Sequence, residues 1–528
     1  MSVHTGVFDE NVHEDPSDDA YDVVVVGSGL GGLTAGALLA KAGKKVLVAE
    51  RHHRPGGYVH GFERDDYVFD SAVHLLSAEG GLAQGVLTLL GAQDACSLIR
   101  VDPFYTAVFP DFRLEVPLGV DAYVEAHAKH FPEQEGPLRE LIDVCFQIPE
   151  EMRRVPTEPG LVDLMRFPRQ CPQLFRYRNA TVGDLADKFL TDDRVKSLFG
   201  AVWPYMGLPP SRLSLLGYAM MWTSYIDGGT LYCRGGFQRL ANAYVTGLER
   251  NGGELVLGRE VQQIVVEDGR AVGVELDGGE RIRASTVVSN AGALQTVERL
   301  VGAEHVPRKY LKKLRELQLS QSCFVLYLVT DFDLHKLDGA THEMFIYPDW
   351  DFDRVYANLL DGEPTSVGIT MPSLHDPTLA PEGEYVLTVI TLLPFEQAAS
   401  WEKGSEPYVE RLLQVLYRAF PELDGRITFL ERASPRTLER FTGNPNGAAY
   451  GWDMTPEQMG RNRPDHRTPL DGLFLSGHWT QPGAGAGGVI VSGVQTAQLV
   501  LGCKTMGDFL DGMGYEETVA GAELAVPS

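Results

Sequence analysis

Two short apolar runs near the start of the chain enclose a glycine-rich turn. The first run, Val23–Val26, is β-branched throughout and is typical of a strand buried on both faces. Small and apolar residues follow the glycines up to Gly43 and predict a helix, and a second run, Val46–Ala49, predicts a second buried strand. Asp22–Ala40 as a whole is nearly apolar over the length of a membrane span, but its glycines and its opening run favour a strand, a turn and a helix.

The rest of the chain divides into helical and strand patterns. Residues 121–226 have apolar positions at helical spacing, and residues 253–290 alternate apolar and polar positions with D-G and G-G turns, which is typical of a β-meander. Residues 323–330 and 385–393 predict buried strands, and residues 409–420 predict a helix. The pattern as a whole predicts an α/β protein.

Composition and charge narrow the class of protein. At roughly 150 residues per domain, the 528 residues allow two to four domains. Hydrophobic residues make up 44% of the chain and charged residues 22%, the profile of a soluble globular protein. The net charge of −26 argues against nucleic acid as a partner, although a local patch is compatible with membrane contact. The six cysteines are far apart and include no C-x-x-C, so we expect a reducing, cytoplasmic setting, and no pattern predicts a metal site.

The turn after the first run has the spacing G-x-G-x-x-G of a dinucleotide-binding fingerprint. Gly27 makes the tight turn, Gly29 lets the backbone approach a pyrophosphate, and Gly32 lets the helix pack closely on the strand. The helix presents free N–H groups and the positive end of its dipole to phosphate. Glu50 ends the second strand about twenty residues further on, where a ribose 2′-hydroxyl is bound. The residues predicted to bind the cofactor here are Gly27, Ser28, Gly29, Leu30, Gly31, Gly32 and Glu50.

The residues after this acid favour FAD over NAD. Gly56 and Gly57 form a doublet that resembles the one in FAD proteins of the glutathione-reductase-like superfamily. Tyr58 stands where arginine is usual, and Arg51 supplies a positive charge nearby, so we expect these four residues to contact FAD. A second G-x-G-x-x-G at residues 483–488 is followed by no strand-terminal acid, and no separate nicotinamide domain is therefore expected.

Longer motifs resemble the phytoene desaturase-like family, which includes carotenoid isomerases, retinol saturases and carotenoid desaturases. The matching segments are Gly56–His74, Gly207–Ser211, Leu231–Gly236 and Asp471–Val500. The resemblance implies that the Val261 backbone lies against the adenine, and that the last segment meets the flavin ring with a helix that starts near Val489. The further FAD contacts that it implies are Val261, Gly477, His478, Gly487, Gly488 and Val489.

This resemblance implies a glutathione-reductase-like Rossmann domain for FAD, assembled from discontinuous segments, and an α+β substrate domain with a helical part. The expected FAD domain comprises residues 21–95, 228–300 and 466–510, and the expected substrate domain comprises residues 96–227 and 301–465. Residues 1–20 are expected to be a disordered acidic tail without a targeting signal, and residues 511–528 a C-terminal tail.

By the same resemblance, we expect an FAD-dependent oxidoreductase that transfers hydride at flavin N5 and desaturates or saturates C–C bonds of a long, lipid-soluble polyene or isoprenoid, similar to a carotenoid or retinoid. Two alternatives stay open: a non-redox cis–trans isomerase that needs reduced FAD, and a flavoprotein that binds a polyene without turnover. An amine oxidase is a weaker redox rival. Similar proteins contact a membrane peripherally through the helical part, and the sequence points to no particular electron partner.

Four side chains are candidates for proton transfer: His60, His74, Tyr205 and Tyr225. His60 ranks first because retinol saturases have a histidine at a similar place after the doublet. Aromatic and methionine residues crowd residues 203–225, which fits an ordinary core and also fits an apolar tunnel. No basic amphipathic helix stands out there by pattern.

Overall fold

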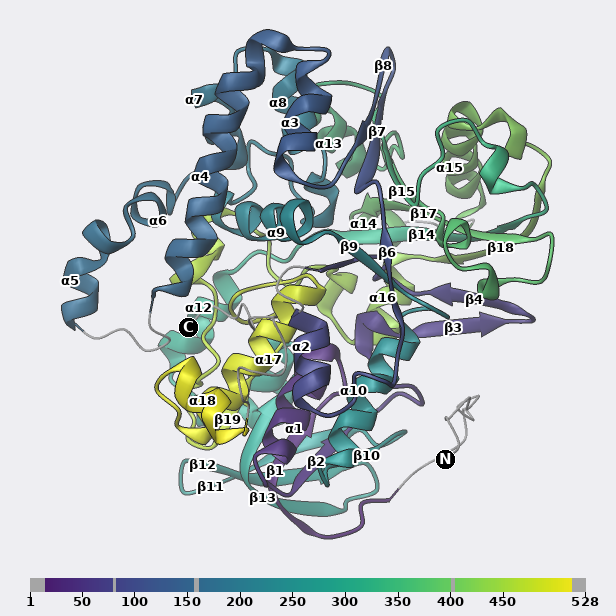
Figure 1. Cartoon of the computed structure of the whole chain (residues 1–528). Helices are drawn as coiled ribbons and strands as arrows, with labels where there is room; N and C mark the ends of the chain where they lie inside the picture. The colour runs from purple at the N-terminus through teal and green to yellow at the C-terminus, as the bar shows by residue number, and fades with distance from the viewer. Residues whose placement is uncertain (1–14, 79–81, 156–160, 400–403, 515–528) are drawn as a thin grey trace.

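Two large β-sheets and a group of helices make up the protein in this computed structural model, which describes residues 15–78, 82–155, 161–399 and 404–514. In Figure 1 the first sheet lies at the bottom, the second sheet lies at the right, and the helical part lies at the upper left. Most of the two tails lies outside the described residues. Within the expected N-terminal tail, however, Ser17 binds Glu254 and Asp18 pairs with Lys45, so this stretch is held against the first sheet.

The first sheet is seven-stranded, and its centre is parallel. From one edge to the other its strands are β10 (Glu254–Val256), β2 (Val46–Ala49), β1 (Ala20–Val26), β13 (Arg281–Ser289), β12 (Arg270–Leu276) and β11 (Val261–Glu267), and β19 (Leu473–Leu475) pairs with β13. The expected meander is antiparallel over β11, β12 and β13 only. The expectation is wrong for β10, which pairs in parallel with β2, because helix α10 (Gln238–Arg250) returns the chain to that edge.

Helices α1 (Leu30–Lys41) and α17 (Ala486–Leu501) cross closely beside this sheet. Glycine permits the approach: a Cβ at Gly493 would lie 2.5 Å from Thr34 Cβ and 2.6 Å from the Gly31 carbonyl oxygen. Helix α17 begins at Ala486, three residues earlier than expected, after Gly485 with a φ of +93°. The same side of the sheet carries α2 (Leu82–Leu89) and α10, and α18 (Met506–Gly512) follows α17.

The second sheet is also seven-stranded and is antiparallel apart from one pair, β15 with β7. Its strands in order are β18 (Ile427–Ala433), β14 (Ser322–Thr330), β17 (Tyr385–Leu393), β16 (Val367–Thr370), β15 (Glu343–Ile346), β7 (Tyr105–Phe109) and β8 (Phe112–Val116). β14 and β17 are the two strands expected from the apolar runs; β14 is buried at every position and β17 at six of its nine. The helices that follow along the chain in this half are α13 (Phe352–Leu360), α14 (Phe395–Ala399), α15 (Glu406–Ala419) and α16 (Pro435–Thr442), whereas α12 (Arg308–Glu316) packs its Leu311 and Leu314 against the core of the first sheet.

Two small sheets connect the large ones. One is a hairpin of β3 (Gly61–Arg64) and β4 (Tyr67–Asp70). The other consists of β5 (Leu76–Ser77), β9 (Thr230–Cys233) and β6 (Leu98–Val101). The segment that joins β4 to β5, residues 71–75, lines the space between the large sheets.

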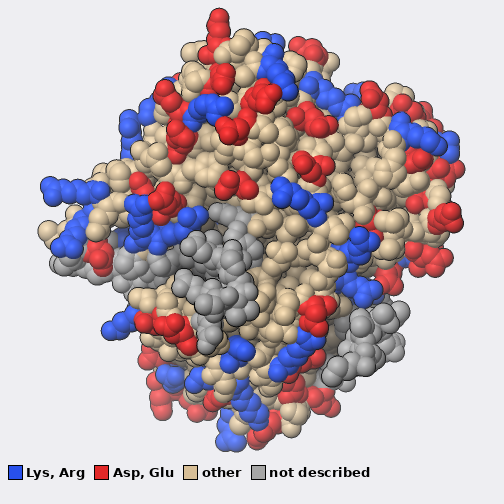
Figure 2. Space-filling model, viewed as in Figure 1, with Lys and Arg blue, Asp and Glu red and all other residues tan. Residues whose placement is uncertain are grey.

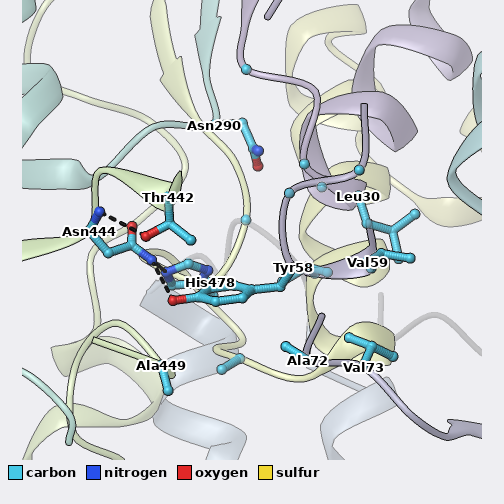
Figure 3. Close-up of a pocket in the computed structure, with 18 of the residues that line it drawn as sticks. Leu30, Tyr58, Val59, Ala72, Val73, Asn290, Thr442, Asn444, Ala449 and His478 are labelled. Carbon is cyan, nitrogen blue, oxygen red and sulfur yellow. Dashed lines mark hydrogen bonds between the residues drawn. The ribbon is translucent and has the colours of Figure 1, made fainter. Parts of the chain in front are cut away.

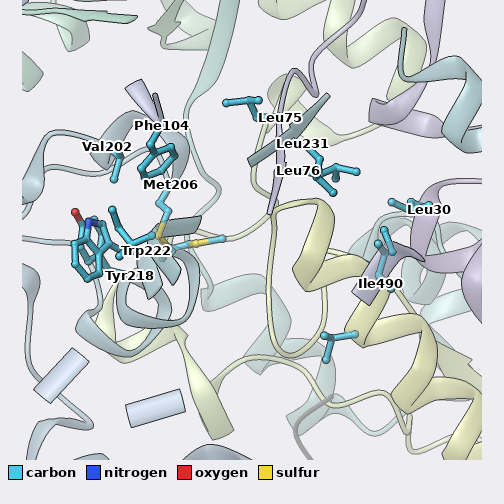
Figure 4. Packing of buried hydrophobic residues seen from close by; sticks show 14 of the residues in the cluster. Leu30, Leu75, Leu76, Phe104, Val202, Met206, Tyr218, Trp222, Leu231 and Ile490 are labelled. Atoms are coloured by element: carbon cyan, nitrogen blue, oxygen red, sulfur yellow. The ribbon is translucent and has the colours of Figure 1, made fainter. Parts of the chain in front are cut away.

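The helical part follows the expected pattern. Its helices are α3 (Val120–Ala128), α4 (Glu135–Arg153), α5 (Leu161–Gln170), α6 (Pro172–Tyr177), α7 (Val182–Phe189), α8 (Asp193–Gly200) and α9 (Leu215–Gly228). Tyr218 and Trp222 of α9 are fully buried and pack in one cluster with Met206 (Figure 4). The same cluster includes Leu30 of α1 and Ile490 of α17, the helices beside the first sheet. No single helix among the described residues is long and apolar enough to cross a bilayer; one pair, α17 and α18, meets that test only when joined across a 79° bend.

Candidate functional site

A cavity of about 320 Å³ lies between the two large sheets. Val26, Ala49 and Asn290, at or just after the carboxyl ends of parallel strands, line one side, and Val325 and Ile390 of the second sheet line the other. Ligands of open parallel sheets bind beyond the carboxyl ends of the strands. Figure 3 shows Leu30, Tyr58, Asn290 and His478, which come from distant parts of the chain, around this space.

The first glycine turn forms a wall of bare backbone in this cavity. Gly27, Gly29 and Gly31 line it, and a Cβ at Gly29 would lie 2.4 Å from Asn290 Nδ2. Helix α1 starts at this wall with Gly29 as its N-cap, without a side-chain cap and without an acidic residue in its first turn. Its first N–H groups are therefore available to an anion, as a pyrophosphate requires. Gly32 does not line the cavity, because it packs against the Gly27 carbonyl.

Glu50 lines the cavity at the end of β2, and the turn holds its carboxylate. Oε2 accepts hydrogen bonds from the Ser28 N–H (2.7 Å) and hydroxyl (2.8 Å), and Oε1 accepts one from the His52 N–H (2.9 Å). Ser28 is buried and does not line the cavity, so it orients the acid instead of facing a ligand. Arg51 lines the cavity and donates to the carbonyl of Phe441, and Val261 lies on the same side.

The glycine doublet packs directly on the first turn. Gly56 and Gly57 have φ values of +120° and +57°, and a Cβ at Gly57 would lie 3.0 Å from the Gly29 Cα. Tyr58, a predicted FAD contact, follows in the place where arginine is usual. Its hydroxyl donates to the Ala448 carbonyl (3.1 Å) and accepts from the Asn444 amide (3.2 Å), and burial raises its pKa to about 12. Tyr58 therefore presents a neutral ring to the cavity (Figure 3).

The last glycine loop supplies the wall beside the first turn. Gly477 and His478 line the cavity, and so does Val489 in the first turn of α17. Burial lowers the pKa of His478 to about 3, and the positive charge of Arg463 acts in the same direction, so this imidazole is neutral. The other two residues expected from this loop, Gly487 and Gly488, line a second cavity of about 150 Å³.

Three of the four proton-transfer candidates come together. His74, Tyr205 and Tyr225 line the main cavity; the ring centroids of His74 and Tyr205 are 5.6 Å apart, and those of the two tyrosines are 6.0 Å apart. His60 does not line it: Nδ1 lies 2.6 Å from the Gly57 carbonyl oxygen and 3.2 Å from the Ser71 hydroxyl. The His60 ring therefore contacts the doublet on the side away from the cavity, a position that sequence spacing alone cannot reveal.

Two polar residues of the site were missed in the sequence. Asn290 follows β13 and lies within reach of two glycine segments, the first turn and the loop at Gly477, and the pattern β-strand then asparagine is the signal that marks it. Glu343 begins β15 and is fully buried, with Oε2 3.5 Å from Nε2 of His74. An acidic residue at the start of an apolar strand, here before Met-Phe-Ile, is unusual, and this pattern is the signal that could have identified Glu343.

The fold and the site together define a flavin-dependent oxidoreductase. The sequence profile of the family described as flavin containing amine oxidoreductase matches residues 30–501, and the chain belongs to this family. The predicted FAD-dependent oxidoreductase and the predicted cofactor, FAD, are thereby confirmed. The bare glycine walls, the open start of α1 and the acid at the end of β2 fit this cofactor.

Relatives along most of the chain support the motif resemblance. The chain is 27% identical over 532 residues to prolycopene isomerase 1, chloroplastic, of an Oncidium hybrid cultivar (95% of this chain, 89% of the relative). It is 28% identical over 508 residues to all-trans-retinol 13,14-reductase of Homo sapiens (86% and 82%), and 30% identical over 493 residues to the neurosporene-forming phytoene desaturase of Rhodobacter capsulatus (90% and 93%). The resemblance to the isomerase, saturase and desaturase branch is confirmed.

Solved structures share the fold. A putrescine oxidase bound to putrescine superposes with a TM-score of 0.65 at 16% identity, covering 92% of this chain and 99% of that one. An oxidoreductase from Methanosarcina mazei superposes with a TM-score of 0.61 at 19% identity (91% and 99%). At these identities the likeness concerns the α/β fold alone, which agrees with the expected fold class.

Replacement of Gly31 by alanine is expected to weaken FAD binding about tenfold or more, equivalent to about 1.4 kcal/mol. The new Cβ would lie 2.9 Å from the Gly477 Cα and 3.0 Å from Asn290 Oδ1, and the Gly477 backbone leaves it no room except by opening the wall. FAD absorbance per protein after dialysis measures the effect. Gly136→Ala in α4, where a Cβ meets nothing within 4 Å, is the control, and equal FAD content in both variants would contradict the assignment.

Acid is expected to destabilise the fold through the buried histidines of the site. Burial lowers the pKa of His74 to about 4 and that of His478 to about 3, so both are neutral when folded. In the unfolded chain these histidines bind protons below their ordinary pKa of about 6.5, whereas in the folded protein they stay neutral. The free energy of unfolding is therefore highest above this pH and falls as the pH drops towards these values, by up to about 1.4 kcal/mol per pH unit per histidine. Urea denaturation across this range should show a shallower pH slope for His478→Gln than for the wild type, and an unaltered slope for the exposed His305→Gln. An equal slope in His478→Gln would contradict the prediction.

Proposed function

We propose that the protein acts on a long, apolar polyene or isoprenoid, similar to a carotenoid or retinoid, and desaturates or saturates its C–C bonds. The observation that carries this proposal is the shape and lining of the space beyond the FAD site. The main cavity and the second cavity share the walls formed by Tyr205, Met221 and Tyr225 and by residues 484–486. Together the two cavities form one apolar path that runs between the sheets and the helical part.

The second cavity is lined by flexible apolar side chains. Its methionines are Met152, Met206, Met220, Met221, Met454 and Met459. Methionine fills irregular space and adapts to extended apolar ligands, so this lining suits a chain-like substrate better than a small amine. The relatives described above are named for prolycopene, retinol and phytoene, and we extend this substrate class to the protein as part of the proposal.

Different residues around the main cavity would hold different parts of the cofactor. The turn Gly27–Gly31 and the start of α1 would hold the diphosphate, Glu50 a ribose, and Gly477 with His478 the side near the ring. Bound FAD supplies hydride and electron transfer. The aromatic side chains of Tyr58, Tyr205 and Tyr225 exclude water from the apolar path and keep the substrate against this site.

A cis–trans isomerase is the second candidate function. The prolycopene isomerase relative aligns over 95% of this chain, a larger share than the reductase or the desaturase. An isomerase would use the same cavities and reduced FAD, with no net change in redox state. Binding of a polyene without turnover is the third possibility that the experiment below separates.

The test is anaerobic incubation of the FAD-loaded protein, oxidised and reduced, with phytoene, prolycopene and all-trans-retinol in detergent micelles. A product that differs by two hydrogens, coupled to bleaching or reoxidation of the flavin, is the expected result and identifies a desaturase or saturase. A change in chromatographic retention without a change in mass identifies an isomerase. Substrates recovered unaltered, with an unaltered flavin, would contradict an enzymatic role on these polyenes.

The helical part also supports a peripheral membrane contact. Met165 of α5 and Phe175 of α6 are 77% and 37% exposed, and basic residues accompany them. The exposed arginines of this protrusion are Arg166, Arg169, Arg176 and Arg178. Figure 1 shows α5 and α6 extending from the body at the left, and Figure 2 shows Lys and Arg atoms gathered on this side. Helix α6 packs on α4, whose Pro149 and Met152 line the second cavity, so a lipid-soluble substrate would enter nearby.

The double variant Met165→Glu/Phe175→Glu is expected to bind vesicles with anionic lipid about tenfold more weakly or worse, because each buried Met or Phe side chain contributes about 1.5–3 kcal/mol. Flotation with such vesicles measures the bound fraction. Gln262→Glu/Gln263→Glu adds the same charge at two exposed positions of β11 and should float like the wild type. A wild-type protein that stays in the aqueous fraction with every lipid mixture would contradict the proposed contact.

A further inference from the structure

Glu343 is a carboxyl group in the middle of the second sheet, between β16 and β7. Its side chain is 0% exposed. The Thr370 hydroxyl donates to Oε2 at 3.2 Å, and the buried hydroxyl of Tyr205 lies near the carboxyl group. Burying a carboxylate in this way is costly, so such a position calls for a reason beyond packing.

His74 connects this acid to the cavity. It lies after β4, its side chain is 20% exposed, and it lines the main cavity. Nδ1 lies 3.1 Å from the Ala72 carbonyl oxygen, which can only accept a hydrogen bond, so Nδ1 carries the hydrogen. The neutral ring then has a bare Nε2, and this atom lies 3.5 Å from Glu343 Oε2. The tautomer that the backbone selects therefore directs a proton acceptor towards the buried acid.

The surroundings keep the pair neutral overall. Burial raises the pKa of Glu343 well above its ordinary value and lowers that of His74 to about 4. The other titratable groups that face Glu343 are Tyr205, Tyr225 and Tyr347, each of which has its own pKa raised by burial. His74 is the basic group in ion-pair range of Glu343 within the described chain. At neutral pH the His74–Glu343 pair therefore holds one proton, and this proton is on the carboxyl group.

We propose that His74 and Glu343 share one proton and move it to or from a carbon atom of the substrate at the cavity wall. His74 is the catalytic residue, because it faces the substrate, and Glu343 is the positioning residue that stores the proton. The inference rests on the proposed function and applies to each of its reactions, since reduction and isomerisation need a proton donor and desaturation needs an acceptor.

The step moves a proton and no electrons from the protein. Towards the substrate, the Nε2–H bond breaks, its electron pair stays on nitrogen, and a π pair of the polyene forms the new C–H bond. The Oε2–H bond of Glu343 breaks to supply Nε2 while the ring faces Glu343, the ring then turns its Nε2–H towards the cavity, and Thr370 stabilises the carboxylate that remains. Bound FAD would supply the hydride that saturation needs and would accept the hydride that desaturation releases. In isomerisation the substrate would return the proton to Nε2 after bond rotation, and in desaturation His74 and Glu343 would carry the proton along the same path in reverse.

Infrared difference spectra of the FAD-loaded protein, wild type minus Glu343→Gln, test the stored proton without turnover. The expected result is the C=O stretch of a protonated carboxylic acid at neutral pH in the wild type only. His74→Phe, which removes the acceptor, should shift this band and serves if Glu343→Gln does not fold. Glu431→Gln, at a partly exposed acid of β18 in the same sheet that pairs with Arg64, should leave it unaltered. A wild type without the band, or a band that His74→Phe leaves in place, would overturn the proposal.

Kinetics with a polyene substrate test the transfer. In Glu343→Gln and in His74→Gln, kcat should fall about a hundredfold at unchanged KM, together with the incorporation of solvent deuterium into the product. The double variant should be no slower than either single variant, because the two residues act as one unit. Unchanged kcat in a folded, FAD-loaded Glu343→Gln, or additive losses, would overturn the inference. A wild type that turns over no polyene would instead refute the proposed function, while the infrared result still decides whether the pair holds a proton.

Discussion

The site depends on the contact of bare backbone from separate parts of the chain. Gly29, Gly31, Gly57 and Gly477 approach one another so closely that a methyl group at these positions would meet backbone or the Asn290 side chain within about 3 Å. This packing creates a cradle with N–H groups and without side chains, which is what a negatively charged, extended cofactor needs. The surrounding sheets and helices hold these few residues in place, so the replacement of any one of them would displace the others.

Beyond the cradle, the protein keeps ionisable groups in their neutral forms. The imidazoles of His74 and His478, the phenol of Tyr58 and the carboxyl of Glu343 all have pKa values displaced by burial towards the uncharged state. A cavity with neutral walls is compatible with an apolar substrate, because no charge must be desolvated when a polyene enters. The proton store and the apolar path are in this sense two consequences of one low-dielectric environment.

Local patterns predicted the parts of the structure that local physics determines. The strand–turn–helix around Gly27, the acid at Glu50 and the buried strands β14 and β17 follow from runs and spacings within a few residues. The site residues that pattern missed depend on distant contacts: Glu343 matters only because β15 places it beside His74, and His60 lies behind the doublet because Ser71 and Gly57 hold its ring. The pattern predicted helices in the region of α5 and α6, but their exposed basic and apolar surface did not stand out, because each helix is short and Pro168 and Cys171 interrupt their periodicity.

The order of the pieces along the chain constrains how the protein is made. Strand β1 and helix α1 lie within the first 41 residues, but they are completed by β13, by β19 and by α17, which ends at Leu501. On the ribosome, the wall that contains Gly477 is therefore missing until β19 and α17 have emerged. Pairings over such sequence separations form slowly and leave apolar surface open meanwhile. We infer that flavin is captured only after α17 has been synthesised, and that truncation before Leu501 abolishes assembly of the cradle, although β1 and α1 would still be made.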